Sequence, residues 1–247
     1  MRIIISPAKT MIRNTDTFGP KGMPVFTDKT ELLRERLCGM SYEECKALWG
    51  CNDKLARLNY ERLEHMDLRE GLTPALFSYE GIQYQYMASR ILETEDYEYL
   101  QDHLRILSGF YGVLKPFDGI VPYRLEMQAR LSCAGRKDLY HFWGDDLYRE
   151  VMDDSRVIID LASKEYSKCI ERYLTPEDEF VTVVFGELSG GKVVQKGTYA
   201  KMARGEMVHF MAEHRVKAPE EIRSFTGLDY HFCEERSSQK EYIFLRG

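Results

Sequence analysis

Two short apolar runs of the sequence are each followed by residues that could perform chemistry. Arg2–Ile5 precedes Ser6 and Lys9, and Val157–Ile159 precedes a polar segment that carries Glu165. Such runs are typical of buried strands, and open α/β sheets bind ligands beyond the carboxyl ends of their strands. Ser6 and Lys9 are candidate catalytic residues, because a Ser-x-x-Lys spacing lets a lysine activate a serine in acyl-transfer enzymes, although the further motifs of those enzymes are absent. The simpler interpretation is a helix cap followed by a solvated lysine.

A third candidate region is the stretch from Leu104 to Met127. It begins as an apolar run, breaks at Ser108-Gly109 and then contains two prolines and further glycines, so it cannot form a long helix. Tyr123, Arg124 and Glu126 follow in close succession. We expect a core strand whose exit contributes polar groups to a site, and the alternative is a core strand followed by an irregular surface loop.

Glu126 and Glu165 complete the set of candidate catalytic residues. Each stands near a cation in the sequence, Arg124 in one case and Lys168 in the other. Neighbouring charges shift the pKa of a carboxyl group, so that it can act as a general acid or base. A cleft of carboxylates, lysines and tyrosines could extrude and process a nucleobase or nucleoside. The alternative is that the two acids only orient the cations through ion pairs.

The charge of the chain is distributed unevenly. The 247 residues carry a net charge of −6 and have a pI of about 5.6, which excludes a protein that is basic over its whole surface. Residues 105–137 and 190–217 nevertheless each contain six cations and only two acids. If these two segments fold together, an acidic protein would carry a basic cleft. We find no repeat, low-complexity segment or linker and expect one domain over residues 1–247.

Several function classes lack support in the sequence. The apolar run at the start of the chain is too short for a signal peptide. No window of the sequence contains the roughly 18 consecutive apolar residues that a membrane span requires. The six cysteines form no CxxC pair, which indicates reduced thiols in a cytoplasmic protein. No zinc motif, P-loop or dinucleotide fingerprint occurs. We therefore expect no membrane contact, no metal and no cofactor.

Hydrophobic spacing and capping residues predict a mixed α/β fold, with a central mixed sheet flanked by helices. A capping box at Ser41 and Glu44 predicts a helix at 42–49, and Asn52 can cap another at 53–66. Asp138 can cap a helix that reaches Val151. Further helices are predicted at 94–103 and 197–214, and further strands at 180–185, 192–195, 230–233 and 242–245. The first two of these strands, 180–185 and 192–195, would form a hairpin around the Gly-Gly pair at 190–191.

Five blocks of the sequence together resemble the YaaA family of bacterial peroxide stress resistance proteins. They are ISPAKTM (5–11), HLRILSGFYGVLKPFDGIVPYRLEM (103–127), FWGD (142–145), LASKEYSK (161–168) and YAKMARGEM (199–207). The resemblance extends nearly from end to end. It implies a mixed α/β fold with a helix-hairpin-helix-like element and a positive cleft. It also implies a cytoplasmic protein linked to hydrogen peroxide defence, lower free intracellular iron and binding of double-stranded DNA. We expect a monomer.

The resemblance gives several residues an expected role in DNA binding. The hairpin of the helix-hairpin-helix-like element would fall on residues 107–112, although a proline and a glycine soon afterwards disfavour a full second helix. Gly109 and Gly112 would let backbone N–H groups approach a phosphate. Positive charge would come from Lys115, Arg124, Lys168, Lys201 and Arg204. Tyr111 and Tyr123 could stack on a base, and the alternative for both is core packing.

Overall fold

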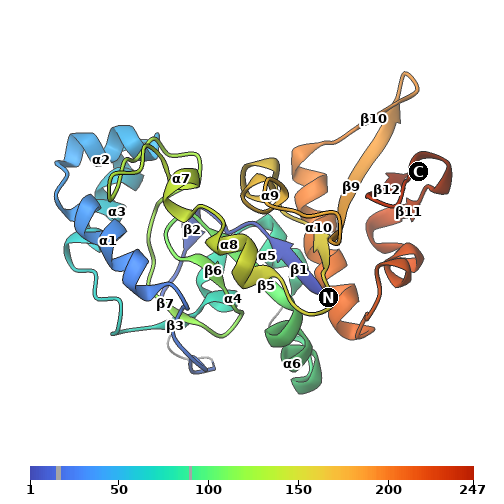
Figure 1. The fold of residues 1–247 in the computed structure, drawn as a ribbon, viewed down its shortest axis with the longest axis horizontal. Helices are drawn as coiled ribbons and strands as arrows, with labels where there is room; N and C mark the ends of the chain where they lie inside the picture. Colours follow the sequence, from blue (N-terminus) through green and yellow to red (C-terminus); the bar gives the residue numbers. More distant parts are fainter. Residues whose placement is uncertain (15–17, 89–90) are drawn as a thin grey trace.

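The structure is a computed structural model that describes residues 1–14, 18–88 and 91–247. The core of its fold is a mixed β-sheet (Figure 1). Its strands follow the order β11-β12-β9-β8-β1-β5-β6, and β10 pairs with β9. The strands of this sheet are β1 (Arg2–Ile5), β5 (Leu104–Ser108), β6 (Gly112–Leu114), β8 (Val157–Asp160), β9 (Glu179–Ser189), β10 (Lys192–Val194), β11 (Tyr230–Phe232) and β12 (Glu241–Arg246). The predicted mixed α/β fold is confirmed.

The interior strand β1 determines where a site can form. It pairs in parallel with both neighbours, so that Ile3 lies opposite Leu104 of β5 and Ile159 of β8. Ile3, Ile4 and Ile5 are fully buried, as the apolar run predicts. The chain leaves β1 to form β5 on one side and later forms β8 on the other side. The carboxyl ends of β1 and β8 therefore flank a topological switch point, where an open sheet leaves a crevice for ligands.

The helices around the sheet lie in separate groups, as Figure 1 shows. Helices α1, α2, α3 and α7 lie together at one end, and α10 lies near β9 towards the other end. The helices are α1 (Thr27–Cys38), α2 (Tyr42–Trp49), α3 (Asp53–Glu64), α4 (Ala75–Ser78), α5 (Ile82–Met87), α6 (Thr94–His103), α7 (Leu139–Trp143), α8 (Asp146–Val151), α9 (Lys164–Glu171) and α10 (Gly197–Glu213). Two small strand pairs join β2 (Thr10–Met11) to β4 (Tyr79–Glu80) and β3 (Thr73–Pro74) to β7 (Gly119–Ile120).

The predicted helix caps of α2 and α3 are confirmed. The backbone N–H of Ser41 donates to the Glu44 carboxylate at 2.8 Å, and the Ser41 hydroxyl accepts from the Glu44 backbone, which completes the capping box. The Asn52 side chain accepts from the backbone N–H of Leu55 at 3.0 Å. Because both caps join residues three positions apart, the local sequence is sufficient to specify them.

The helix predicted from Asp138 to Val151 is divided into two. Asp138 caps α7 as expected, since its carboxylate accepts from the backbone N–H of His141 at 2.9 Å. The helix ends at Gly144, whose φ of 56° lies in the left-handed region that favours glycine. A second helix, α8, then begins at Asp146. The glycine was the sequence signal for this break.

The segment expected to form a helix-hairpin-helix-like element forms a β-hairpin instead. Strands β5 and β6 pair antiparallel, with Ser108 opposite Gly112. The Ser108 hydroxyl accepts from the backbone N–H groups of Phe110 and Tyr111 at 3.1 and 2.9 Å and so closes the turn. The apolar residues before the turn lie in an interior strand of the sheet, where pairing with β1 requires an extended backbone.

Candidate functional site

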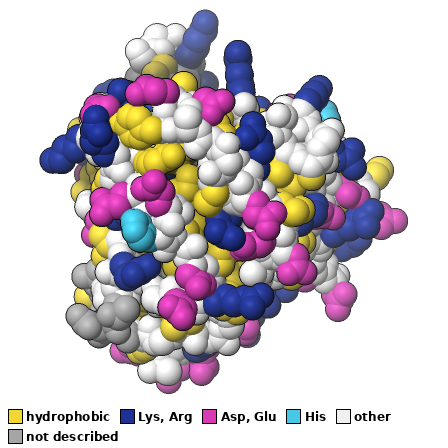
Figure 2. Space-filling view, turned by 90° about the vertical axis from the view of Figure 1, so that its left-hand side faces the viewer, with side chains coloured by type: hydrophobic (Ala, Val, Ile, Leu, Met, Phe, Trp, Pro, Cys, Tyr) yellow, Lys and Arg dark blue, Asp and Glu magenta, His cyan; other side chains and the backbone are white. Residues whose placement is uncertain are grey.

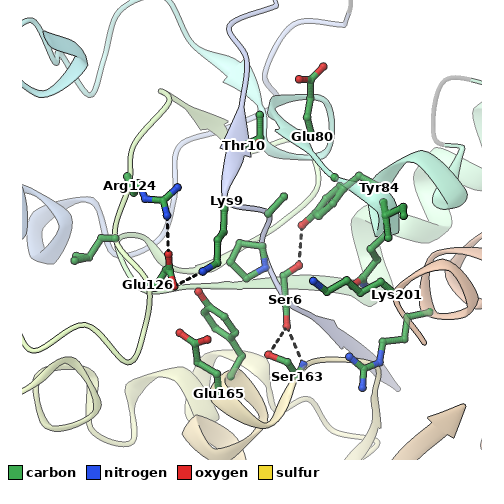
Figure 3. A pocket seen from close by; sticks show the side chains of 18 of the residues that line it. Ser6, Lys9, Thr10, Glu80, Tyr84, Arg124, Glu126, Ser163, Glu165 and Lys201 are labelled. Atoms are coloured by element: carbon green, nitrogen blue, oxygen red, sulfur yellow. Dashed lines mark hydrogen bonds and ion pairs between the residues drawn. The ribbon is translucent and has the colours of Figure 1, made fainter. Parts of the chain in front are cut away.

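A cavity of about 490 Å³ lies beyond the carboxyl ends of β1 and β8 (Figure 3). Five segments that are distant in the sequence line it, at 6–10, 80–84, 123–126, 163–166 and 201–204. Four of the five family-like blocks thus meet at one place. The fifth block, FWGD, does not line the cavity, and the indole N–H of its Trp143 donates to the carbonyl of Gly109 at 3.0 Å.

Ser6 and Ser163 join the two strand exits directly. The backbone N–H of Ser163 donates to the Ser6 hydroxyl at 2.8 Å, and the Ser6 hydroxyl lies 3.2 Å from that of Ser163. Tyr84 donates to the carbonyl of Ser6 at 3.0 Å. Lys9 Nζ contacts Glu126 instead of Ser6 (Figure 3). The described contacts therefore do not include the lysine–serine contact on which an acyl-transfer mechanism depends.

Glu126 holds two cations at one end of the cavity. Its carboxylate accepts from Lys9 Nζ at 2.7 Å and from Arg124 Nη2 at 3.1 Å. The Arg124 side chain is 9% exposed and that of Lys9 is 66% exposed. This is the arrangement expected if Glu126 orients cations through ion pairs, and its one negative charge offsets half of the positive charge of the two cations.

Glu165 has a different environment in the same cavity. Its carboxylate accepts from the backbone N–H of Gln128 at 3.1 Å. Burial raises the pKa of Glu165, and the nearby charge of Glu126 raises it further, while Lys9 and Lys168 act in the opposite direction. A carboxyl group whose pKa is raised retains its proton to a higher pH than a free one, which favours a role in proton transfer. Glu165 is therefore the candidate proton-transfer group of the cavity.

The tyrosines of the cavity belong largely to the core. Tyr123 is 7% exposed, and its hydroxyl bonds to Ser108 at 2.6 Å and Tyr79 at 2.8 Å. Its ring stacks on Phe110 at 4.9 Å between centroids. Burial raises the pKa of Tyr123 to about 12. These contacts fit the core-packing interpretation, and they leave little of the Tyr123 ring for stacking on a base.

Helix α10 contributes two cations to the opposite end of the cavity. Lys201 and Arg204 are three positions apart, so they lie on one face of the helix, as predicted. Lys201 is exposed, whereas burial lowers the pKa of Arg204. Neither cation has a carboxylate within ion-pair distance in the described part of the chain.

The glycine turn expected to meet a phosphate lies in the interior. Gly109, Tyr111 and Gly112 are all buried, and the Tyr111 hydroxyl accepts from the backbone N–H of Val121 at 3.1 Å. A Cβ on Gly109 would lie 2.6 Å from the carbonyl of Leu125. These glycines therefore allow close packing of the chain against itself, which is a correction to their expected role in contacting DNA.

Two further cations lie outside the cavity. Lys115 is exposed in the turn after β6. Lys168 lies over the ring of Tyr140, with 4.0 Å between Nζ and the centroid. Conversely, no sequence pattern indicated Glu80 and Gln83, which line the cavity from β4 and α5. Only the glycine between them marked the position as unusual, and it did not indicate which side chains face a ligand.

A second, more open hollow of about 770 Å³ continues the cavity. It shares Lys9, Arg124 and Glu126 with the cavity and extends to Trp49 and Arg130. Figure 2 shows the side of the molecule with α1–α3, where Lys and Arg side chains are interspersed with Asp and Glu. On that face the cations are not gathered into one broad patch, so the concave surface is the better candidate for binding an anion.

The described residues include no cluster of three His, Cys, Asp or Glu side chains that could hold a metal ion. No helix among them is long and apolar enough to cross a bilayer.

Replacing the three cysteines that are not buried, Cys38, Cys51 and Cys233, with Ser is expected to leave peroxide protection unchanged. The other three are poor peroxide sensors, because the thiolate is the reactive form and burial disfavours it. Burial raises the pKa of Cys45 to about 11 and that of Cys169 to about 12, and it also raises the pKa of Cys133. Survival of peroxide by a strain that lacks the native protein is the measurement, with thermal melting as the control for folding. Lost protection by a folded variant would identify a sensor thiol.

Comparison with known proteins gives consistent similarities over the whole chain. A family model described as "Peroxide stress protein YaaA" matches residues 1–236. A UPF0246 protein of Agathobacter rectalis is 56% identical over 246 residues, which cover 100% of this chain and 99% of the relative. Its counterpart in Lachnoclostridium phytofermentans is 54% identical over 247 residues, with 100% and 97% covered. That of Desulfitobacterium hafniense is 50% identical over 246 residues, with 100% and 98% covered.

Proposed function

The chain belongs to the YaaA family of peroxide stress proteins, and from this membership we propose that it binds double-stranded DNA and limits iron-dependent oxidative damage. The observation that carries the proposal is the convergence of Lys9, Arg124, Lys201 and Arg204 on one concave surface. Because the whole protein is acidic, attraction of a polyanion must come from such a local group of cations. A cytoplasmic location and a monomeric state are part of this proposal.

The proposed link to iron is electrostatic. Cations that contact DNA phosphates release the counterions condensed on the duplex. Ferrous ions bound to the backbone are among the counterions that would be displaced, so peroxide would react with iron farther from the bases. This role requires neither a metal site nor catalysis in the protein. It does require that the cations of the cavity reach phosphates.

Neutralising Lys201 and Arg204 together by substitution with Gln is expected to weaken binding to duplexes of any sequence. The slope of log affinity against log salt should become less steep by about one for each lost phosphate contact. Fluorescence anisotropy with two unrelated duplexes over a range of salt concentrations provides the measurement. The matched control is Lys192→Gln with Lys217→Gln, since both lysines are exposed and lie outside the cavity. An unchanged affinity and slope in the folded α10 variant would exclude this binding surface.

A second candidate function is an enzyme that acts on a nucleobase or nucleoside. The observation that favours it is Glu165, a half-buried carboxyl with a raised pKa in a cavity of about 490 Å³. That volume falls within the range of ligand sites, from about 300 to 1,000 Å³, and does not admit a duplex, whose phosphates could contact only the cations at its rim. A base would therefore have to leave the duplex to reach Glu165, as in enzymes that flip bases. A protein that only binds phosphates has no need of this carboxylate.

A further inference from the structure

The two ends of the cavity differ in charge. At one end the carboxylate of Glu126 accepts from Lys9 and Arg124. At the other end Lys201 and Arg204 have no carboxylate partner among the residues that the structure describes. The α10 end therefore carries positive charge that the protein itself does not neutralise.

Arg204 shows this imbalance most clearly. Its Nε is enclosed without a hydrogen-bond acceptor among the described residues. The charge of Asp160 acts on Arg204, but that carboxylate is already bonded to the Ser167 hydroxyl at 2.7 Å and the Ala162 N–H at 2.9 Å. The Arg204 side chain is half-buried, and an enclosed guanidinium N–H without an acceptor costs free energy that an anionic ligand would offset.

The start of α9 adds hydrogen-bond donors at the same end. Ser163, its N-cap residue, lines the cavity and makes no side-chain bond to the first turn of the helix, because its hydroxyl is 3.2 Å from that of Ser6. Helix starts that lack a side-chain cap present backbone N–H groups and a partial positive charge, and both favour an anion.

Gln83 is an independent sign of a missing acceptor. The residue is 7% exposed and lines the same cavity. Its amide Nε2 is enclosed without a hydrogen-bond partner in the described part of the chain. Buried polar atoms are nearly always hydrogen-bonded, so an enclosed amide without an acceptor at a cavity wall indicates a place for a ligand oxygen.

We propose that the α10 end of the cavity is a subsite for the phosphate group of a nucleotide, formed by Gln83, Ser163, Lys201, Arg204 and the start of α9. A phosphate fits better than a carboxylate, because donors come from several elements and directions, while the fork of Arg204 alone would serve a planar carboxylate. The remainder of the cavity, between Tyr84 and the Glu126 end, takes the nucleoside. The choice of a nucleotide as ligand rests on the proposed function. The bound phosphate belongs either to a free nucleotide or to a nucleotide within a DNA strand.

Calorimetric titration with inorganic phosphate, deoxyadenosine monophosphate and deoxyadenosine tests the subsite. We expect wild type to bind phosphate, and to bind the monophosphate at least about tenfold more tightly than the nucleoside, since hydrogen bonds to charged groups are among the strong ones. Lys201→Gln and Arg204→Gln should each weaken binding of the monophosphate about tenfold and leave that of the nucleoside unchanged. Lys192→Gln, on exposed β10, is the matched control and should behave as wild type.

Two results would overturn the subsite. One is equal affinity of wild type for monophosphate and nucleoside. The other is undiminished affinity for the monophosphate in folded Lys201→Gln and Arg204→Gln. If circular dichroism shows that Arg204→Gln does not fold, the affinity of Lys201→Gln for the monophosphate is sufficient for the test, because Lys201 is exposed.

Competition against a labelled duplex distinguishes the two sources of the phosphate. If the monophosphate displaces the duplex and both ligands depend on Arg204, the subsite holds a nucleotide of a strand. If binding of the monophosphate depends on Arg204 while wild type binds no duplex, the subsite binds a free nucleotide. The proposed DNA binding is then wrong. Failure of the subsite and failure of the proposed function thus give different results.

Discussion

Glu165→Gln is expected to abolish peroxide protection in cells while the protein still folds and binds duplex DNA at least as tightly as wild type. This result follows from the enzymatic candidate. The substitution keeps the size of the side chain and removes the proton-transfer group, whose contribution is typically a factor of about 10² to 10⁴ in rate. Binding of DNA should not weaken, because a carboxylate in the cavity repels a polyanion. The measurements are thermal melting, duplex affinity at fixed salt, and survival of peroxide in a strain that lacks the native protein.

Two other carboxylates provide the comparison for Glu165. Glu80 is exposed at the rim of the same cavity, so Glu80→Gln makes the same change in charge without touching the buried group. Glu126→Gln would free Lys9 and Arg124 from their ion pairs and is expected to tighten duplex binding. If the Glu126 and Glu165 variants fold, bind and protect normally, the enzymatic candidate should be abandoned. The two acids would then be understood as partners that orient the cations.

Gly205→Ala is expected to destabilise the protein by about 3 kcal/mol, at the upper end of the usual cost of overpacking. A Cβ at this position would lie 2.1 Å from the carbonyl oxygen of Gln83 and 2.9 Å from the backbone nitrogen of Met87. These are backbone atoms of α5, so α5 and α10 would have to separate. The intrinsic preference of Ala over Gly in a helix, about 1 kcal/mol, acts in the opposite direction and is smaller. For a chain of this length the melting temperature should fall by about 6 to 12 °C.

Gly197→Ala is the matched control, because Gly197 also lies in α10 but has no atom within 4 Å of the added Cβ. It should melt at or slightly above the wild-type temperature. The same separation of helices would move Gln83 away from Arg204, so Gly205→Ala should also weaken nucleotide binding even below its melting temperature. Equal melting temperatures for the two variants would show that the two helices can adjust at no cost, contrary to the close packing described above.

Elements that depend on nearby residues could be predicted from the amino-acid sequence. The capping box at Ser41, the Asn52 cap and the hairpin at 190–191 all join residues a few positions apart, and the structure confirms them. Runs of β-branched residues likewise identified β1 and β8, because their burial follows from composition alone. The family was evident from the five blocks, and the comparison shows it.

Which polar residues share a site depends on tertiary packing and could not be predicted from the sequence. Ser6 and Ser163 meet across 157 positions because β1 and β8 happen to be adjacent parallel strands, a pairing that neither segment encodes alone. Gly109 and Tyr111 looked suited to DNA contact, but strand pairing places them in the interior, since a turn is exposed only if nothing packs over it. Gln83 joined the site only through the contact of α5 with α10. Caps and strands result from short-range forces along the chain, whereas a cavity results from long-range packing, whose pattern is spread over residues far apart in the sequence.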